Sequence, residues 1–303
     1  MRVKKASKGQ KFLSFIISIL LMLSIIVSIL SISVNFIILN PNTYYKVLDK
    51  RNIYNEIYNV VDDNISYVLT LNNLSQDIKN NVISEAEVKS EVKGFVSDIM
   101  KYLRTGVKDI SEVNVDTYIE RFDNNLNEFF KNNSIIVNNE TKEEINSLEN
   151  DVTQIIQSEL QIVNVDIINN NDVFNKVAKI TSLFTSKLYF APIILVLVFI
   201  LLLFAVWRSD YVRLLQWIGN SFISSGLMIF LIFFSGYISK FYEYISISTI
   251  YLRTFVSSII KSYLGILSLW AVLAIVIGVI LIIPKVRQAI KIGSYKNKSY
   301  FYL

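Results

Sequence analysis

Four runs of apolar residues, none of which contains a charged residue, dominate the pattern along the chain. A helix needs about 20 apolar residues to cross the hydrocarbon core of a bilayer, and each run is close to or above that length. The first run also follows a basic segment, as a signal anchor does. The pattern therefore predicts four transmembrane helices, at residues 12–39, 188–206, 214–239 and 262–284.

The long segment between the first two runs, residues 40–187, is polar with helical spacing. Ser84 and Glu87 form a capping box ahead of apolar residues that recur every three or four positions, and Gly106 is a typical helix stop. Few turn residues follow Pro41, which disfavours a β-sandwich or barrel. The predicted fold is an all-α membrane protein with four transmembrane helices and an extracytoplasmic α-helical bundle domain. Four further stripes, in which apolar residues recur on one face of a predicted helix, begin near Tyr44, Asp116, Thr141 and Asp172.

For two places in this segment the sequence predicts where a helix begins or whether it continues. Thr141 and Glu144 form a second capping box, so the helix there should begin after Thr141. The stripe that begins at Val173 keeps helical spacing up to the second apolar run, which predicts one continuous helix with a kink at Pro192. The alternative is a helix that ends and a new one that begins at Ala191, with the proline in its first turn.

The connection between the last two runs, residues 240–261, is amphipathic. Its apolar and aromatic residues recur at helical spacing: Tyr242, Tyr244, Ile247, Tyr251, Phe255 and Ile259. Two arrangements fit this pattern. The connection lies on the outer membrane face as an interfacial helix, or it covers the underside of the outer helical domain.

Charge is distributed unevenly between the connections, and this predicts the orientation of the chain. The two tails, residues 1–11 and 285–303, carry basic residues and no acidic one, and the connection 207–213 holds two arginines against one aspartate. Residues 41–187 contain 15 lysines and arginines and 23 aspartates and glutamates, a net charge of −8. Basic residues near spans stay in the cytoplasm. We therefore expect both termini to be cytoplasmic and the acidic segment to lie outside.

Composition agrees with a membrane protein and indicates its compartment. The chain is 52% hydrophobic and 18% charged, against about 25% charged in ordinary soluble domains. It is rich in Ile and Asn and poor in Ala, a bias typical of an AT-rich bacterial genome. We expect a bacterial plasma membrane protein. Its first span should be an uncleaved signal anchor, although Ser31–Ser33 also resembles a weak cleavage site.

The sequence carries no recognisable catalytic or metal-binding constellation. It has no cysteine and no histidine, which removes thiolate chemistry, the commonest general base and the commonest metal ligand. Adjacent acidic pairs such as Asp62–Asp63 point about 100° apart on a helix and read as solvated faces. We expect no cofactor, no metal site, no nucleic-acid partner and no enzymatic activity. The spans hold no Asp, Glu, Lys, Arg or His, which disfavours ion-coupled transport.

Small and hydroxyl residues gather on one face of several spans. Such residues allow helix backbones to approach closely in lipid. They predict packing of the four spans against one another, or, as the alternative, a face that binds a second membrane protein or a second copy. The candidate packing residues are Ser14, Ser18, Ser24, Ser28, Ser221, Ser225, Gly236, Ala271, Ala274 and Gly278.

One stretch resembles a known group of proteins. Arg208 to Leu227 reads RSDYVRLLQWIGNSFISSGL, and the opening of the polar segment reads NPNTYYKVLDKRNIYNEIY. Both are similar to a broad family of uncharacterised bacterial four-span membrane proteins with a helical outer domain between spans one and two. The resemblance implies this layout and carries no activity or catalytic residue.

Three functions remain open at this level. The leading hypothesis is a non-enzymatic envelope sensor, scaffold or interaction protein that acts through its outer helical domain, with the lipid bilayer and another membrane or envelope protein as partners. The alternatives are a passive channel or transporter component and an accessory subunit of an envelope enzyme.

Overall fold

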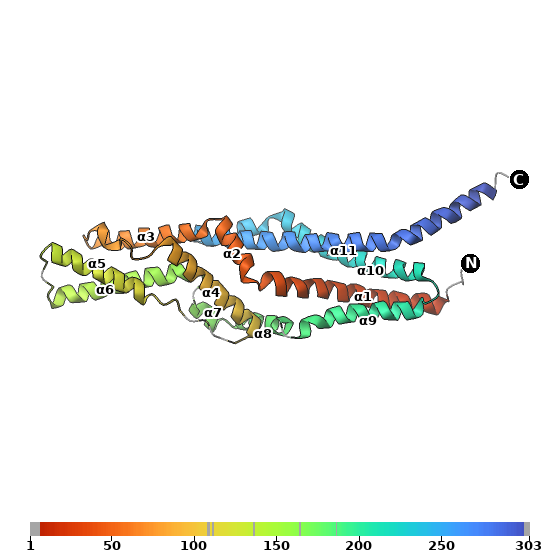
Figure 1. Ribbon diagram of the computed structural model, residues 1–303, viewed down its shortest axis with the longest axis horizontal. Coiled ribbons are helices and arrows are strands. Elements are labelled where there is room, and N and C mark those ends of the chain that lie inside the picture. The colour runs from red at the N-terminus through yellow and green to blue at the C-terminus, as the bar shows by residue number, and fades with distance from the viewer. Residues whose placement is uncertain are drawn as a thin grey trace. The chain divides into compact units, whose positions relative to one another are not determined.

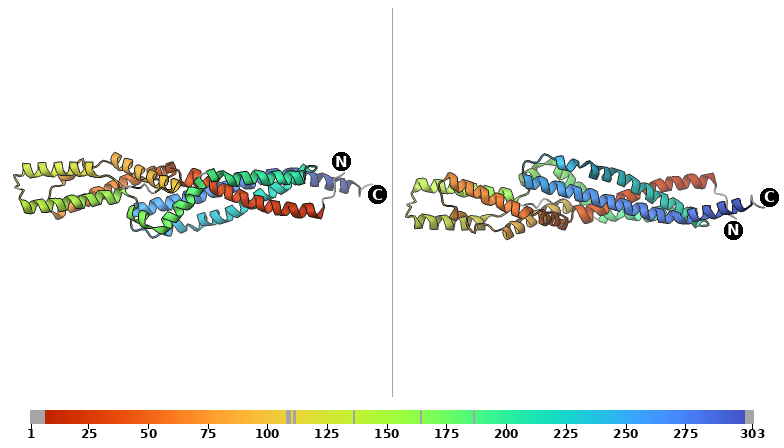
Figure 2. Two further views of the ribbon diagram at one scale, coloured as in Figure 1. Left: turned by 90° about the horizontal axis from the view of Figure 1, so that it is seen from below. Right: turned by 90° about the horizontal axis from the view of Figure 1, so that it is seen from above.

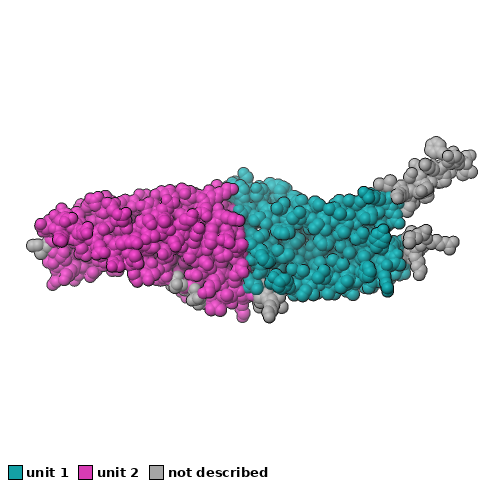
Figure 3. Space-filling view, viewed as in Figure 1, with its two compact units in different colours: residues 1–38, 183–244, 260–303 teal, residues 39–182, 245–259 magenta. Residues whose placement is uncertain are grey.

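The computed structural model describes residues 7–107, 110, 112–135, 137–163, 165–185 and 187–299, and the regular elements in these residues are all helices (Figure 1). The chain divides into two units, coloured in Figure 3. Unit 1 comprises residues 1–38, 183–244 and 260–303, and unit 2 comprises residues 39–182 and 245–259. The all-α fold and a helical bundle between the first two apolar runs are thereby confirmed.

Among the residues that the structure describes, three helices are long and apolar enough to cross a membrane, at residues 8–38, 211–239 and 250–288. They belong to α1 (Lys8–Ser33) with its π-helical continuation η1 (Val34–Ile38), to α10 (Tyr211–Ser239) and to α11 (Ile250–Ser299). These helices indicate a multi-pass membrane protein in contact with a lipid bilayer. The fourth apolar helix, α9 (Ala191–Val206), has 16 residues and is about 24 Å long at 1.5 Å per residue.

Within unit 1, α9 runs antiparallel to α1. The Trp207 Nε1–H, just after α9, donates to Ser14 Oγ near the start of α1 at 2.7 Å. At the opposite end, the rings of Phe36 and Tyr189 meet edge to face with centroids 6.4 Å apart. α9 and α1 lie side by side in both views of Figure 2. A short turn then leads into α10, whose N-cap Asp210 accepts the backbone N–H of Arg213 at 3.1 Å.

The helix before α9 does not continue into it, so the prediction of one continuous helix kinked at Pro192 is wrong. α8 (Asp172–Thr185) ends first, and the 3₁₀ turn η3 (Lys187–Phe190) separates it from α9. Pro192 lies in the first turn of α9. A first-turn residue has no intrahelical acceptor for its N–H, so proline is tolerated there and its fixed φ favours a helix start.

The last apolar run also differs from its predicted limits. Pro284, the expected end of the span, lies inside α11, and the helix is described as far as Ser299. Figure 1 shows α11 changing direction toward its C-terminal end, as expected for a helix that accommodates a proline.

Residues 245–259 of the amphipathic connection belong to unit 2, which agrees with the second of the two arrangements considered for it. After the short 3₁₀ turn η4 (Phe241–Tyr244), the first residues of α11 pack within unit 2 and bury Tyr251, Phe255 and Ile259. The Tyr251 hydroxyl donates to Glu159. The part of the stripe in α11 therefore faces protein, whereas Tyr244 before it is 83% exposed.

Unit 2 is a helical bundle around one apolar core. Its other elements are α2 (Pro41–Lys50), α3 (Ile53–Leu71), the 3₁₀ turn η2 (Gln76–Lys79), α4 (Glu85–Thr105), α5 (Asp116–Asn132), α6 (Asn139–Leu160), α7 (Val165–Asn170) and most of α8. α3 packs on α4 and α6, and α5 packs on α6 and η2. Most of the fully buried core side chains come from α3 to α6, and Leu48, Ile78, Val82 and Ile168 are buried to the same extent. The buried side chains of α3 to α6 include Ile57, Val61, Ile65, Leu69, Val88, Val92, Phe122, Leu126, Val152, Ile156 and Leu160.

The helix boundaries in unit 2 agree with the sequence in part. The capping box of Ser84 and Glu87 starts α4, and Gly106 ends it in the left-handed region with φ 69°, as predicted. The box at Thr141 is wrong, because Asn138 is the N-cap of α6 and its side chain accepts the Thr141 N–H at 2.8 Å. The stripe after Pro41 forms two helices because Asn52, with φ 54°, breaks it.

The apolar stripe of α8 does not face the core. Val173 and Ile180 are 68% and 54% exposed. α8 packs through other residues: Phe174 stacks on Tyr102 of α4, and Ala178 is buried. Helical spacing predicted the helix correctly but not the face that packs.

Candidate functional site

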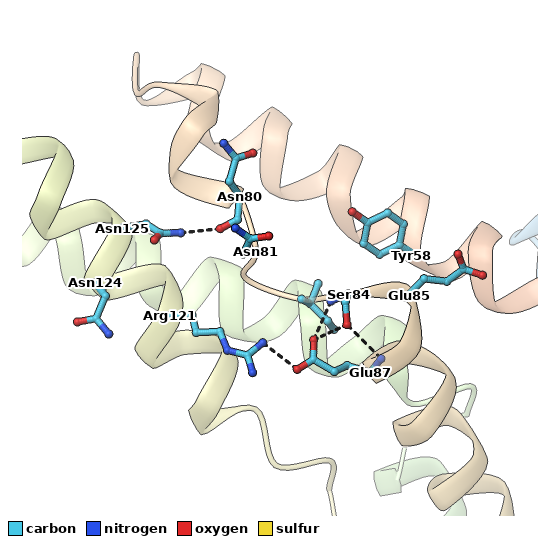
Figure 4. Close-up of a pocket in the computed structure, with 10 residues that line it drawn as sticks. Tyr58, Asn80, Asn81, Ser84, Glu85, Glu87, Arg121, Asn124 and Asn125 are labelled. Atoms are coloured by element: carbon cyan, nitrogen blue, oxygen red, sulfur yellow. Dashed lines mark hydrogen bonds and ion pairs between the residues drawn. The ribbon is translucent and has the colours of Figure 1, made fainter.

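An open, polar hollow of about 770 Å³ lies on unit 2 where α3, α4 and α5 meet the loop after η2 (Figure 4). Hydroxyl, amide and charged side chains dominate its lining, together with one aliphatic residue. The lining residues are Tyr58, Asn80, Asn81, Ile83, Ser84, Glu85, Glu87, Arg121, Asn124 and Asn125.

Two side chains one turn apart on α5 fix the backbone of this hollow. Asn125 Nδ2 donates to the carbonyls of Ile78 and Asn80 at 2.9 and 2.8 Å. Arg121 Nη1 donates to the Val82 carbonyl at 3.3 Å and pairs with Glu87 at 2.8 Å. Because residues at i and i+4 share a helix face, α5 holds the whole loop from one side.

The hollow also carries polar groups that the fold does not use. The side chains of Asn81, Asn124, Glu85 and Tyr58 make no side-chain hydrogen bond among the described parts of the chain. Figure 4 shows them around the opening. A primary amide donates and accepts, so these groups are suited to a polar, largely uncharged ligand.

Sequence reasoning missed this hollow. It includes two Asn-Asn steps, Asn80–Asn81 and Asn124–Asn125, but the same step also occurs at residues 72–73, 132–133 and 138–139 and so does not single out the hollow. In each step one asparagine, Asn80 or Asn125, takes part in the hydrogen bonds of the loop, and all four asparagines line the hollow. Asn81 also adopts φ 59°, a left-handed conformation that asparagine tolerates better than most residues.

A pair of carboxyl groups lies between α5 and α6. Desolvation and the hydrogen bond and negative charge of Asp123 raise the pKa of Glu149 to about 7. Asp123 Oδ1 is buried and has no hydrogen-bond partner in the described residues. Two nearby carboxylates cannot both ionise without repulsion, so this contact holds a proton near neutral pH.

We expect unit 2 to lose stability as the pH rises from about 4.5 to about 7, because the folded state binds the Glu149 proton more tightly than the unfolded chain does. The site is partly solvated, so the effect should be on the order of 1 kcal/mol. Glu149→Gln should flatten this pH dependence and raise the melting temperature at pH 8. Thermal unfolding of the purified protein across this range tests it, and an unchanged slope in the variant would contradict it.

The serines predicted to pack in the first span lie on the buried side of α1. Ser14, Ser18, Ser24 and Ser28 are each less than 10% exposed. Ser14 accepts the Trp207 N–H, and Ser18 Oγ lies 2.6 Å from Ser221 Oγ of α10. Within the described residues Ser24 and Ser28 form no such bridge, and the Ser28 hydroxyl donates to the Ser24 carbonyl of its own helix at 2.7 Å.

The small residues of α10 and α11 meet at a close helix crossing. A Cβ atom at Gly278 would lie 2.6 Å from the Gly219 carbonyl oxygen, and one at Gly226 would lie 2.7 Å from the Ala271 carbonyl oxygen. The two backbones therefore touch. Gly219 and Gly226 were missed, although their seven-residue spacing matches that of Ala271 and Gly278 on the facing helix.

The remaining predicted packing residues are also inside unit 1 or at its helix contacts. Ala274 is 4% exposed, and Ser225 is fully buried with its hydroxyl donated to the Phe222 carbonyl at 2.9 Å. A Cβ at Gly236 would lie 3.3 Å from Leu264 of α11. These contacts serve packing and bring no reactive group together.

No group of three or more acidic side chains that could hold a metal ion occurs in the described part of the chain. Comparison with protein-family models, with curated proteins and with solved structures finds no match for this chain. The function must therefore be argued from the geometry and chemistry of the chain itself.

Proposed function

We propose that this chain is a four-span protein of the bacterial plasma membrane that acts as a non-enzymatic interaction protein through unit 2, held outside the membrane. The observation that carries the proposal is the amide-lined hollow of unit 2, whose backbone is fixed by α5 and whose outer side chains are unused.

The path of α9 along α1 supports four spans. The contacts Ser14–Trp207 and Phe36–Tyr189 pair the two segments over 22 positions of α1 and η1. At about 1.5 Å per residue this is roughly 33 Å, enough for a hydrocarbon core of about 30 Å. The 3₁₀ turn before α9 adds about 2 Å per residue, which compensates for the shortness of the helix.

Charge supports the orientation. With four spans, both basic tails and the Arg208–Arg213 connection lie on one side, and the acidic segment lies on the other. Basic flanks favour the cytoplasmic side, which places unit 2 outside and leaves its hollow open to the envelope.

The chemistry of the hollow supports binding over catalysis. It offers amides, a tyrosine hydroxyl and one carboxylate, with Arg121 and Glu87 already paired to each other. The chain has no histidine or cysteine to act as base or nucleophile. The rival proposals are a passive channel or transporter component, which would place function in the spans, and an accessory subunit of an envelope enzyme, which would dock that enzyme on unit 2.

Site-specific photo-crosslinking in intact cells tests the proposal. A photoreactive residue at Asn81 or Asn124 should give the same discrete adduct from both sides of the hollow. Asn150, an exposed asparagine on α6 outside the hollow, is the matched control and should not give it. Identical adducts at all three positions, or none at the two hollow positions, would contradict a binding role for this site.

A further inference from the structure

Two polar side chains lie on the outer surface of α10 within an apolar region of unit 1. Asn220 and Ser224 are one helical turn apart and exposed. Neither side chain makes a hydrogen bond to any part of the chain that the structure describes. Apolar side chains that are themselves exposed surround them, including Phe15, Ile19 and Leu227 at 54%, 39% and 46%.

These two residues border a hollow of about 300 Å³ between α1 and α10. One wall is formed by Phe15, Ile19 and Met22 of α1, and its floor includes Ser18 and Ser221. The floor serines bond to each other at 2.6 Å. Besides the indole N–H of Trp217, the hydrogen-bonding capacity that remains available in the hollow lies at the rim, on Asn220 and Ser224.

The position of Asn220 makes an unpaired amide costly. It lies seven residues beyond Arg213 on a candidate span, which is about 10 Å along the helix axis. This depth falls within a hydrocarbon core of about 30 Å, where water does not satisfy a polar side chain and acyl chains offer no hydrogen bond. The amide needs a partner from outside the chain's own bundle.

We propose that the Asn220–Ser224 face of α10 is the contact through which two copies of this chain associate in the membrane. A carboxamide is self-complementary, because its NH₂ group donates and its carbonyl accepts. In a two-fold interface the same patch meets itself, so the two Asn220 amides satisfy each other and the hollow beside each receives an apolar side chain of the partner. The patch carries no charged residue, which disfavours a headgroup phosphate as the occupant.

The absence of cysteine from the chain allows a direct test in native membranes. Two differently tagged copies carrying Ser224→Cys, or in a second pair Leu227→Cys, are co-expressed and treated with an oxidant or a short bismaleimide. We expect a crosslinked species that carries both tags. Adding Asn220→Leu should lower its yield about tenfold, the effect of losing one interhelical amide contact, while Asn220→Gln should retain most of it.

The matched control is Val198→Cys on α9, which is 41% exposed and lies nine residues before the turn at residues 207–210, as Asn220 lies ten residues after it. It should crosslink far less. The melting temperature of Asn220→Leu should stay unchanged, because the side chain is outside the bundle. Equal yields at Val198, no two-tag species with either cysteine, crosslinking to a different chain only, or no effect of Asn220→Leu would each overturn the proposal.

Discussion

Gly278→Ala should lower the melting temperature of the protein in detergent by about 4–8 °C, the equivalent of about 2 kcal/mol of overpacking. The added methyl group would lie 2.6 Å from the Gly219 carbonyl oxygen and 2.8 Å from the Ile223 backbone nitrogen. Neither atom is the end of a flexible side chain. The helices α10 and α11 must separate to admit it, which removes their other close contacts.

Gly265→Ala is the matched control on the same helix. There a Cβ atom would meet Tyr237 at 3.7 Å, an ordinary contact, and alanine favours a helix by about 0.5–1 kcal/mol over glycine. This variant should be as stable as the parent or slightly more stable. If Gly278→Ala behaves in the same way under circular dichroism melting, the close crossing of α10 and α11 is not what holds them together.

Trp207→Ala should destabilise unit 1 by about 3 kcal/mol, a fall of roughly 6–12 °C in melting temperature. Trp207 is 4% exposed and packs in the cluster of Leu21, Leu203 and Ile218. Its indole N–H bonds Ser14, and Arg213 lies over its ring at 5.4 Å. Truncation leaves a cavity and removes all three interactions.

Trp207→Phe separates packing from the hydrogen bond. It keeps much of the ring volume and loses the bond to Ser14 Oγ, so its cost should be about 1 kcal/mol. Leu201→Ala on α9, where the side chain is 65% exposed, should cost little. Equal losses in the Trp207→Ala and Leu201→Ala variants would contradict the packing of α9 against α1.

The sequence predicted elements well where the signal is local. The capping box at Ser84 and the glycine stop at Gly106 depend on a few neighbouring residues, and both form as expected. The prediction was wrong where two local structures are both compatible with the same residues. Asn138 and Thr141 are both residue types that can cap α6, and Asn138 is the N-cap in the structure. Pro192 is compatible with a kink or with a first turn, and the first turn occurs.

Tertiary contacts were predicted less well than elements. The serine stripe of α1 indicated a buried face, yet nothing in its spacing showed that Ser18 would meet Ser221 and that Ser14 would meet Trp207. The stripe of α8 is apolar and exposed, because periodicity does not say which face finds a partner.

The amide-lined hollow could not be predicted from the pattern of residues along the sequence. Its residues come from α3, α4, α5 and one loop, and each is an ordinary surface residue in the linear sequence. Arg121 and Asn125 gain their role only when α5 lies against the loop at residues 78–84. A site assembled from distant surface residues leaves no local spacing to detect.

Single-cysteine labelling in intact cells tests the central claim most directly. Ser7→Cys, Ser90→Cys and Ser299→Cys are made in the cysteine-free chain and treated with a membrane-impermeant maleimide before and after permeabilisation. Four spans with unit 2 outside predict labelling at position 90 in intact cells and at positions 7 and 299 only after permeabilisation. Labelling of position 7 or 299 in intact cells, or protection of position 90, would contradict the account.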